Sequence, residues 1–344
     1  MQMYKAFKQG NAGEHNMATT RIYVGMHDGV TSLTSTDGGS SWRQGSVTAL
    51  EHASAKVAAS ASSPERAYLV AYEAGVHRTD DGGQTWKQLP SYPTDHAQSV
   101  AVHPTNPDIV YVGSEPATVY RSNDGGSTWK ECSAFREVPG ADEWSFHWEG
   151  RHAHVRDLRF SPENPDVIYA GIEVGGILRS SDGGQTWKHL HGANTDVHKV
   201  IASPSKPSTI YAATAHGPFR SDDSGDTWTD IGTGLERRHN IPIIQAPDDH
   251  NLVIAGVASS ARRKEAQVVR STDGGRNWSK LDDLGADDNM VVSLAWDSGD
   301  PNRVFAGTDH GTIHMSTDRG ASWSLICDTI ATVAVGAIAI SSFK

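Results

Sequence analysis

Cysteine is scarce in this chain of 344 residues, which contains only Cys132 and Cys327. They lie far apart in the sequence and lack the close spacing of a metal-binding pair, so neither a disulfide framework nor a cysteine-based zinc site is predicted. Long hydrophobic runs are also missing, and the most hydrophobic segment, residues 333–340, is far too short to span a bilayer. No window shows the periodicity of an amphipathic helix, which indicates an all-β chain.

Basic residues are outnumbered, because 30 Lys and Arg stand against 41 Asp and Glu, for a net charge of −11. This balance argues against binding to nucleic acid or to an anionic membrane surface through bulk charge. Residues 1–20 are polar and contain no apolar stretch of the kind found in secretory signals. We therefore expect a disordered tail over residues 1–20 and a cytoplasmic protein with no membrane partner.

The chain is rich in one feature, an octapeptide of the form Ser/Thr-x-Asp-x-Gly-x-x-Trp that occurs seven times. Its aspartates are Asp37, Asp81, Asp124, Asp182, Asp223, Asp273 and Asp318. Successive aspartates are separated by 41 to 58 residues, and a repeat of about 40–45 residues is the size of one four-stranded propeller blade. Seven copies predict a seven-bladed β-propeller.

Short β-rich runs bounded by turn residues fill the space between the octapeptides, as in residues 99–103 and 109–113. The first repeat lacks an innermost strand, whereas residues 333–340 form a strand-like run with no octapeptide after it. We expect this C-terminal strand to join residues 21–46 in blade 1, which would close the ring and remove its open edges. The predicted propeller spans residues 21–344.

The octapeptide is interpreted as a structural turn. A short carboxylate can accept backbone N–H groups of its own turn, the hydroxyl adds a hydrogen bond, and glycine supplies a conformation that other residues resist. The tryptophan then buries a large ring between sheets. A catalytic or calcium-binding role for the aspartates is the disfavoured alternative, because a group needed once is not supplied seven times.

The repeat resembles the Asp-box, or BNR, repeat of the sialidase-like superfamily, and the resemblance covers residues 21–344. Relatives include sialidases, sortilin-type receptors, photosystem II assembly factors and xyloglucan-cleaving glycosidases, which resemble two such propellers face to face. The sialidase signature is absent, since Arg21-Ile22 is followed by Tyr23 instead of proline and no arginine triad or Tyr-Glu pair is evident. The overall pattern of the sequence is most similar to that of uncharacterised single-domain bacterial BNR proteins. The shared scaffold alone implies no function.

We expect the functional site at the mouth of the central channel, opposite the octapeptide turns, where loops of many blades converge. Alignment of the inner strands places polar side chains at two positions in blades 3 to 6, whereas the other blades carry mainly small residues there. The polar set is His96, Gln98, His154, Arg156, Asp196, His198 and His239. The pattern favours a one-sided pocket, and its alternative is that strand starts are simply solvated.

Two further features belong to the same face. Glu173 lies in a turn of blade 4, beside the predicted positions of His154 and Arg156. The long link between blades 3 and 4 carries Trp144, Phe146 and Trp148 in alternation, so an extended segment would show all three rings on one side. Rings flanked by carboxylates suit a sugar, with Trp144 and Trp148 as substrate-binding residues alongside His96, Gln98 and His239. The alternative is that these rings fold into a small core of their own.

The leading hypothesis is an enzyme that acts on a small polar, carbohydrate-like or anionic substrate. His154 and His198 are candidate proton-transfer groups and Asp196 could orient one of them. Arg156 would hold a carboxylate, phosphate or sulfate, and Glu173 would act as an acid. This set is compatible with hydrolysis or with β-elimination from a uronic acid.

Two other hypotheses stay open. In one, a divalent metal ion is the cofactor and His154, His198 and His239 are its ligands, although Arg156 nearby argues against a cation. In the other, the propeller is not catalytic and binds a ligand or a protein through the mouth and its loops.

Overall fold

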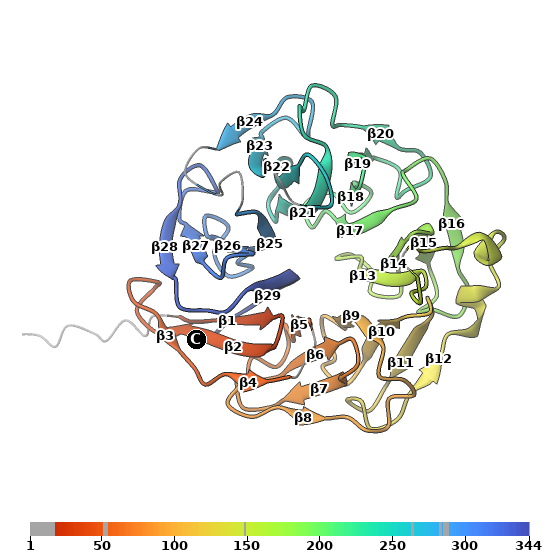
Figure 1. Cartoon of the computed structure of the whole chain (residues 1–344), viewed down its shortest axis with the longest axis horizontal. Coiled ribbons are helices and arrows are strands. Elements are labelled where there is room, and N and C mark those ends of the chain that lie inside the picture. Colours follow the sequence, from red (N-terminus) through yellow and green to blue (C-terminus); the bar gives the residue numbers. More distant parts are fainter. Residues whose placement is uncertain are drawn as a thin grey trace, which may run out of the picture.

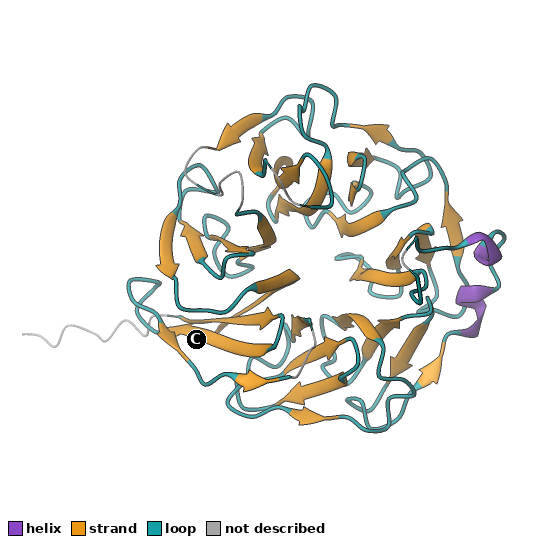
Figure 2. Ribbon diagram, in the orientation of Figure 1, coloured by secondary structure: helices purple, strands orange, loops and turns teal. Residues whose placement is uncertain are grey.

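The computed structural model describes residues 18–50, 54–147, 149–262, 265–281, 284 and 289–343. These residues form seven antiparallel sheets arranged as blades around a central channel, which confirms the all-β, seven-bladed prediction (Figure 1). The helices in the described part are two short 3-10 turns, η1 (Ser133–Arg136) and η2 (Ala141–Glu143), in the link between blades 3 and 4 (Figure 2).

Each blade has four principal strands, which follow one another from the channel outward. Blade 1 contains β29 (Val333–Phe343), β1 (Thr19–Met26), β2 (Gly29–Ser35) and β3 (Arg43–Gln44), with β4 (Thr48–Ala49) also paired to β2; blade 2 contains β5 (Ala55–Ala59), β6 (Ala67–Ala71), β7 (Gly75–Thr79) and β8 (Lys87–Gln88). Blade 3 contains β9 (Ala97–Val102), β10 (Val110–Ser114), β11 (Val119–Ser122) and β12 (Lys130–Glu131); blade 4 contains β13 (His154–Phe160), β14 (Ile168–Glu173), β15 (Gly176–Ser180) and β16 (Lys188–Leu190). Blade 5 contains β17 (Val197–Ala202), β18 (Ile210–Thr214), β19 (Gly217–Ser221) and β20 (Thr229–Asp230); blade 6 contains β21 (His239–Ala246), β22 (Asp249–Ala258), β23 (Gln267–Ser271) and β24 (Ser279–Leu281); blade 7 contains β25 (Val291–Trp296), β26 (Val304–Thr308), β27 (Ile313–Ser316) and β28 (Ser324–Cys327).

The ring closes inside blade 1, as the sequence predicts. Strand β29 pairs antiparallel with β1, with Ile340 opposite Ile22 and Ser342 opposite Thr20. Strand β1 begins at Thr19, two residues before the expected start of the propeller. The rest of the predicted tail, residues 1–17, lies outside the described residues.

The octapeptide forms a self-contained turn between the third and fourth strands. In blade 4, Ser180 Oγ donates to Asp182 Oδ1 and accepts the N–H of Gly184, each at 2.8 Å. The Asp182 carboxylate accepts the N–H and the hydroxyl of Thr186 at 2.8 and 2.6 Å. Gly184 has a φ of 87°, which a residue with a Cβ resists. The tryptophan that follows, Trp187, donates from Nε1 to the Gly184 carbonyl at 3.2 Å.

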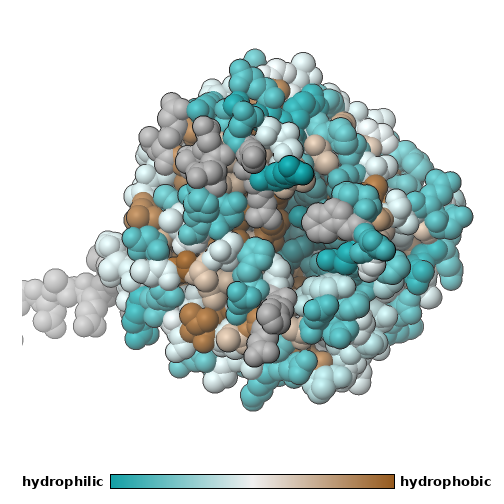
Figure 3. Space-filling model, in the orientation of Figure 1, coloured by the Kyte–Doolittle hydropathy of each residue, from teal (hydrophilic) through white to brown (hydrophobic). Residues whose placement is uncertain are grey.

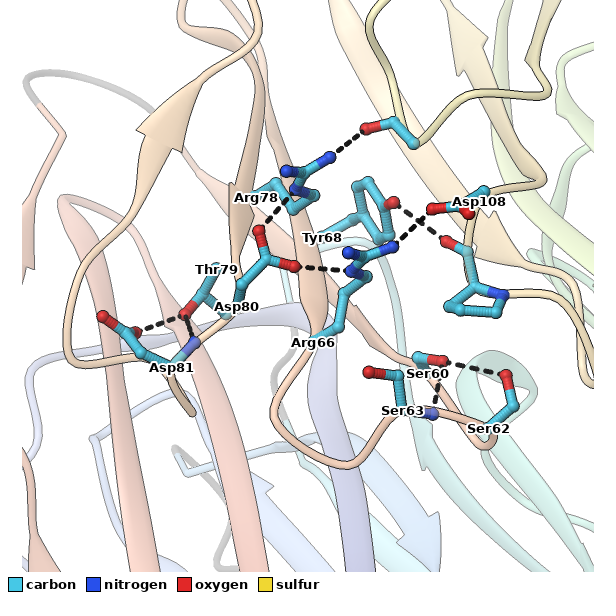
Figure 4. Close-up of polar contacts among 12 residues, drawn as sticks. Ser60, Ser62, Ser63, Arg66, Tyr68, Arg78, Thr79, Asp80, Asp81 and Asp108 are labelled. Carbon is cyan, nitrogen blue, oxygen red and sulfur yellow. Dashed lines mark hydrogen bonds and ion pairs between the residues drawn. The ribbon is translucent and has the colours of Figure 1, made fainter.

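Tyrosines of the second strands join each of blades 1 to 5 to the blade that follows it. Tyr68 is fully buried and its hydroxyl donates to the Pro107 carbonyl of blade 3 at 3.0 Å (Figure 4). Beside it, Arg66 bridges Asp80 of its own blade and Asp108 of blade 3, at 2.5 and 2.6 Å. Equivalent buried tyrosines in other blades are Tyr23, Tyr111, Tyr169 and Tyr211, whose hydroxyls donate to Pro64, Gly183, Ser224 and His250 carbonyls.

Arginines of the third strands make a second inter-blade contact, directed at the neighbouring octapeptide. Arg78 donates to the Gly125 carbonyl at 2.8 Å, and Arg179 donates to the Ser224 carbonyl at 2.7 Å. The same bond recurs from Arg121 to Gly183, Arg220 to Gly274 and Arg270 to Arg319. Each of these octapeptide turns is therefore an acceptor for the preceding blade as well as a turn within its own.

The face of the molecule in Figure 3 is mostly hydrophilic, and its hydrophobic patches are small and scattered. The free thiols Cys132 and Cys327 stand in blades 3 and 7. In the part of the chain that the structure describes, no helix is long and apolar enough to cross a membrane.

Trp187→Ala should lower the free energy of unfolding by about 3 kcal/mol, because the ring packs edge-on against the buried Phe135 at a centroid distance of 5.0 Å. Urea denaturation measures this loss. The exposed Gln88→Ala in β8 is the control and should change stability by less than about 0.5 kcal/mol. Equal effects of the two substitutions would contradict the packing described.

Stability should fall steeply between pH 4 and pH 2. Burial opposes the ionisation of Asp81, but the hydrogen bonds from Thr85 and Thr79 together lower its pKa from 3.8 to about 2. Side-chain and backbone bonds from Thr128 lower the pKa of Asp124 likewise. Because these pKa values are depressed in the folded state, the stabilisation is present above the unfolded value and is lost as the pH falls through the folded one. Urea unfolding at pH steps from 6 to 2 tests this, and Asp124→Asn should make the pH dependence shallower. A flat profile would refute it.

Candidate functional site

β-Bulges occur in the innermost strands of blades 3 to 5, and similar register shifts occur in β21 of blade 6 and at Val292 in β25 of blade 7. The pairing register skips Gln98 in β9, Arg156 in β13 and His198 in β17. A bulge leaves its extra residue out of the ladder and re-aims that side chain, and bulges are frequent beside functional sites. These three residues occupy equivalent positions in the sequence alignment of the inner strands, so the alignment identified a real structural equivalence.

Glu173 is the centre of the first cluster of charged groups. It stands opposite His154 in the β13–β14 ladder and is only 8% exposed. Its carboxylate forms an ion pair with Arg156, and its Oε2 lies 3.5 Å from His154 Nε2. Burial opposes ionisation, but the adjacent Arg156 and then His154 hold the pKa of Glu173 well below its usual range. Glu173 is therefore an anion at neutral pH.

His198 joins this cluster from blade 5. Its Nδ1 lies 2.6 Å from the Asn240 carbonyl, which can only accept, so we assign the proton to Nδ1. Its Nε2 lies 3.4 Å from Asp196 Oδ1, a buried oxygen that has no hydrogen-bond partner. The His239 ring lies 4.9 Å from the His198 ring. Burial and then His198 lower the pKa of His239 to about 4, so this imidazole is neutral at pH 7.

Glu173, Asp196 and His198 form the one described group of three side chains whose potential ligand atoms all lie within 4.8 Å of one another. Of the three histidines predicted as metal ligands, only His198 belongs to it. Two carboxylates and an imidazole that donates its other N–H to a carbonyl suit a divalent cation. However, Arg156 already neutralises one of these carboxylates, so the donor set fits a metal ion poorly.

A second cluster surrounds Glu115, in blade 3. This carboxylate accepts two bonds from Arg151, at 2.7 and 2.6 Å, and one from Gln98 at 2.8 Å. It also lies 3.6 Å from His154 Nδ1. Burial opposes ionisation, but the Arg151 side chain and the His152 N–H lower the pKa of Glu115. His154 therefore stands between two carboxylates, and sequence reasoning missed one of them because Glu115 looked like an ordinary turn residue.

His96 stands at the edge of this second cluster. Its ring stacks on Tyr72 at 4.4 Å, and the Arg151 guanidinium lies 4.2 Å from the centre of the Tyr72 ring. His96 Nε2 also lies 3.5 Å from an Asp95 carboxylate oxygen. The predicted residues thus divide into a Glu115 cluster, with His96 and Gln98, and a Glu173 cluster, with Arg156, Asp196, His198 and His239, and His154 contacts both carboxylates.

The link between blades 3 and 4 lies against the mouth. The backbones of Ser145 and Val174 exchange two hydrogen bonds of 3.2 Å, which fix the link to the β14–β15 turn. Phe146 lies 5.2 Å from the His154 ring, whereas Trp144 packs against Phe135 at 5.5 Å. Trp144 and Phe146 also line a groove of about 380 Å³. Trp144 thus joins the core on one side and the groove on the other, and Trp148 lies outside the described residues.

Two lysines in the channel were not recognised from the sequence. Lys56 of β5 donates from Nζ to the Arg156 carbonyl at 3.0 Å, and Lys199 of β17 is 8% exposed, with Nζ 3.5 Å from the Leu294 carbonyl. Burial and then Arg156 lower the pKa of Lys56 to about 7. A lysine inside an otherwise apolar inner strand, as in Ala55–Ala59, was the available signal.

A comparison with protein-family models matches residues 30–165 and 175–284, more than half of the chain, to the family described as Sortilin-Vps10, sortilin, neurotensin receptor 3. The chain belongs to the Sortilin-Vps10 family. This membership agrees with the Asp-box propeller expected from the octapeptides. It does not test the predicted similarity to single-domain bacterial BNR proteins.

Among curated proteins, this Sortilin-Vps10 chain is 25% identical over 221 residues to a Paenibacillus xyloglucanase, covering 50% of the chain and 21% of the relative. The chain thus spans about a fifth of that enzyme's length. Two solved structures share its fold at 17% identity. An ancestral GH74 enzyme has a TM-score of 0.66 over 79% of this chain and 38% of its own, and YCF48 bound to D1 peptide has a TM-score of 0.58 over 85% and 94%.

Glu173→Gln should lower the free energy of unfolding by roughly 3–5 kcal/mol, because it leaves the Arg156 guanidinium without its counter-charge in a largely buried site. Adding Arg156→Gln should restore part of the loss. Glu236→Gln, which neutralises a highly exposed carboxylate paired with Arg237, is the matched control at less than about 1 kcal/mol. Urea denaturation of the four proteins measures all three effects. A Glu173→Gln loss no larger than the control loss would contradict the pairing.

Proposed function

We propose that the chain is a glycan-directed hydrolase or lyase whose site is the channel mouth on blades 3 to 6, with a small acidic carbohydrate as its ligand. The observation that carries the proposal is the convergence of Arg156, Asp196 and His198 around the buried Glu173. Bulges on β13 and β17 put Arg156 and His198 at equivalent positions of neighbouring blades.

His198 is the proposed proton-transfer residue. Its Nδ1 is committed to the Asn240 carbonyl, so Nε2 is the nitrogen that exchanges a proton with substrate. Asp196, 3.4 Å from that nitrogen, would stabilise the imidazolium formed when His198 takes a proton. The neutral His239 imidazole beside it adds no competing charge.

Arg156 is the proposed anion-binding residue. A guanidinium has five N–H donors, and Arg156 uses Nη1 on Glu173 while its buried Nε has no hydrogen-bond partner. Spare donors on a buried cation favour a ligand carboxylate, phosphate or sulfate. Glu173, predicted from the sequence to act as an acid, takes a different role here, because its lowered pKa suits a group that holds Arg156 rather than one that donates a proton.

The xyloglucanase relatives support a carbohydrate ligand, and the Trp144–Phe146 groove beside the mouth is where its further sugar units would bind. Because the chain spans 21% and 17% of two such relatives, its own substrate is part of the proposal. A closer kinship with single-domain bacterial BNR proteins, a cytoplasmic location and the absence of a nucleic-acid partner also stay predictions.

A second candidate function is non-catalytic binding. The fold matches 94% of the YCF48 chain that is named as bound to a peptide, so a single propeller of this shape suffices for recognition in that protein. The same mouth would then bind a ligand through Arg156 without turnover.

The deciding assay incubates the protein with xyloglucan and with a uronate-containing polysaccharide. New reducing ends measure hydrolysis, and ultraviolet absorbance of an unsaturated uronate measures elimination. His198→Ala should lower turnover at least about 100-fold, the usual range for loss of a proton-transfer residue. Because this buried ring also bonds the Asn240 carbonyl, the melting temperature should fall as well, and the assay is run at a temperature where circular dichroism shows the variant to be folded. His310→Ala, an exposed histidine in a turn of blade 7 on the same face, is the matched control and should keep full activity.

The outcomes separate the two functions. Turnover that survives His198→Ala would refute the assigned role. Absence of turnover together with calorimetric binding that is lost in Arg156→Gln would establish the binding function in its place. Neither turnover nor binding with any acidic glycan would overturn the glycan proposal as a whole.

A further inference from the structure

Below the mouth, cationic side chains converge on the axis of the channel. A small cavity there is lined by Lys56, Arg156, Arg159, Lys199 and a single carboxylate, Asp157, together with His198. The remaining walls are apolar residues of blades 1, 6 and 7. We call this constriction the channel waist. Lys56 reaches it from blade 2 and Lys199 from blade 5, so the positive groups come from opposite sides of the ring.

Two of the four positive groups of the waist have an anionic partner in the protein, because Arg156 pairs with Glu173 and Arg159 with Asp157, whereas the two lysines have none among the described residues. Asp157 is engaged with Arg159, at 3.2 Å from Nε and 3.1 Å from Nη2, and it also accepts the Val200 N–H at 3.0 Å. Within the described residues neither Lys56 nor Lys199 forms an ion pair, and their ammonium groups reach only backbone carbonyls. A buried ammonium with unused donors and no counter-charge is unfavourable.

The size of the cavity limits what can supply the missing charge. It measures about 20 Å³, and one water needs roughly 10–15 Å³ by the same measure. A sugar, a carboxylic acid or a phosphate is too large for this cavity, which is the place where Lys56, Arg159 and Lys199 meet. Arg159 and Lys199 also line a wider adjoining part of the channel, of about 360 Å³, which Lys56 does not line. A monatomic anion is not too large for the small cavity, and three N–H-bearing side chains around an apolar-walled space are a suitable shell for one.

We propose that the channel waist binds one halide ion, chloride under ordinary conditions, through Lys56, Arg159 and Lys199. Its negative charge would face both lysines and supply the counter-charge that neither has. Burial lowers the pKa of Lys56 to about 7 in the protein alone, and an anion beside the ammonium would favour its charged form. The ion would bind next to Arg156 and His198, which also belong to the proposed mouth site, but its binding does not require a glycan there.

The test compares chloride with gluconate, an anion too bulky for the cavity, at constant ionic strength. Thermal unfolding should show a melting temperature that rises with chloride and saturates, by roughly 3 °C at a hundredfold excess over the dissociation constant. The double variant Lys56→Met/Lys199→Met should abolish the rise. Lys87→Met, which removes an exposed lysine of β8, should keep it in full.

A crystal soaked in bromide locates the ion directly. An anomalous peak between Lys56 and Arg159 would support the site independently of stability. A chloride effect that persists in the double variant, or the absence of both the peak and the chloride effect, would overturn the proposal. If the double variant does not fold, the single variant Lys56→Met takes its place in the same measurement.

Discussion

The hydrogen bond from a third-strand arginine to the next blade's octapeptide is the contact on which the ring depends. Arg179, for example, donates to the Ser224 carbonyl, and the buried Tyr169 hydroxyl contacts the same oxygen. The Ser224 carbonyl is available because the hydroxyls of this turn, on Ser221 and Thr227, donate to the Asp223 carboxylate instead. A turn whose own groups are hydrogen-bonded thus offers a free carbonyl to the neighbouring blade, and five such contacts link blades 2 to 6 each to the blade that follows.

This arrangement separates the two faces of the propeller. Folding contacts gather on the octapeptide face, where tyrosines, arginines and turn carbonyls recur from blade to blade. The opposite face carries no such repeat, so its strand starts can differ between blades without loss of closure. Arg156, His198 and Gln98 occupy one bulged position in three blades, yet each has a different partner. The contacts that hold the blades together repeat around the ring, whereas the side chains at the mouth differ from blade to blade. Such differences are what allow a symmetric fold to form a specific binding site.

Features shared by the blades could be predicted from the sequence, whereas contacts specific to one or two blades could not. The blade count, the closure by β29 and the equivalence of Gln98, Arg156 and His198 follow from period and alignment, whereas the bulges at these positions were not predicted. Glu115 and Lys56 were missed because their importance lies in contacts across blades, Glu115 with Arg151 and Lys56 with the Arg156 carbonyl. The alternating aromatic link combines both alternatives considered from the sequence, because Trp144 and Phe146 line one groove while Trp144 also packs against the buried Phe135.

The charges along the channel bear on how the two proposed sites would act on each other. Arg156 and His198 line the waist as well as the mouth, so both sites share them. An anion in the waist would stabilise the imidazolium that His198 becomes after it takes a proton. The same anion would weaken the electrostatic attraction between Arg156 and an anionic ligand at the mouth. By linkage, a ligand at the mouth must change the affinity of the waist by the same factor. An acidic ligand would therefore bind the mouth less tightly when chloride fills the waist.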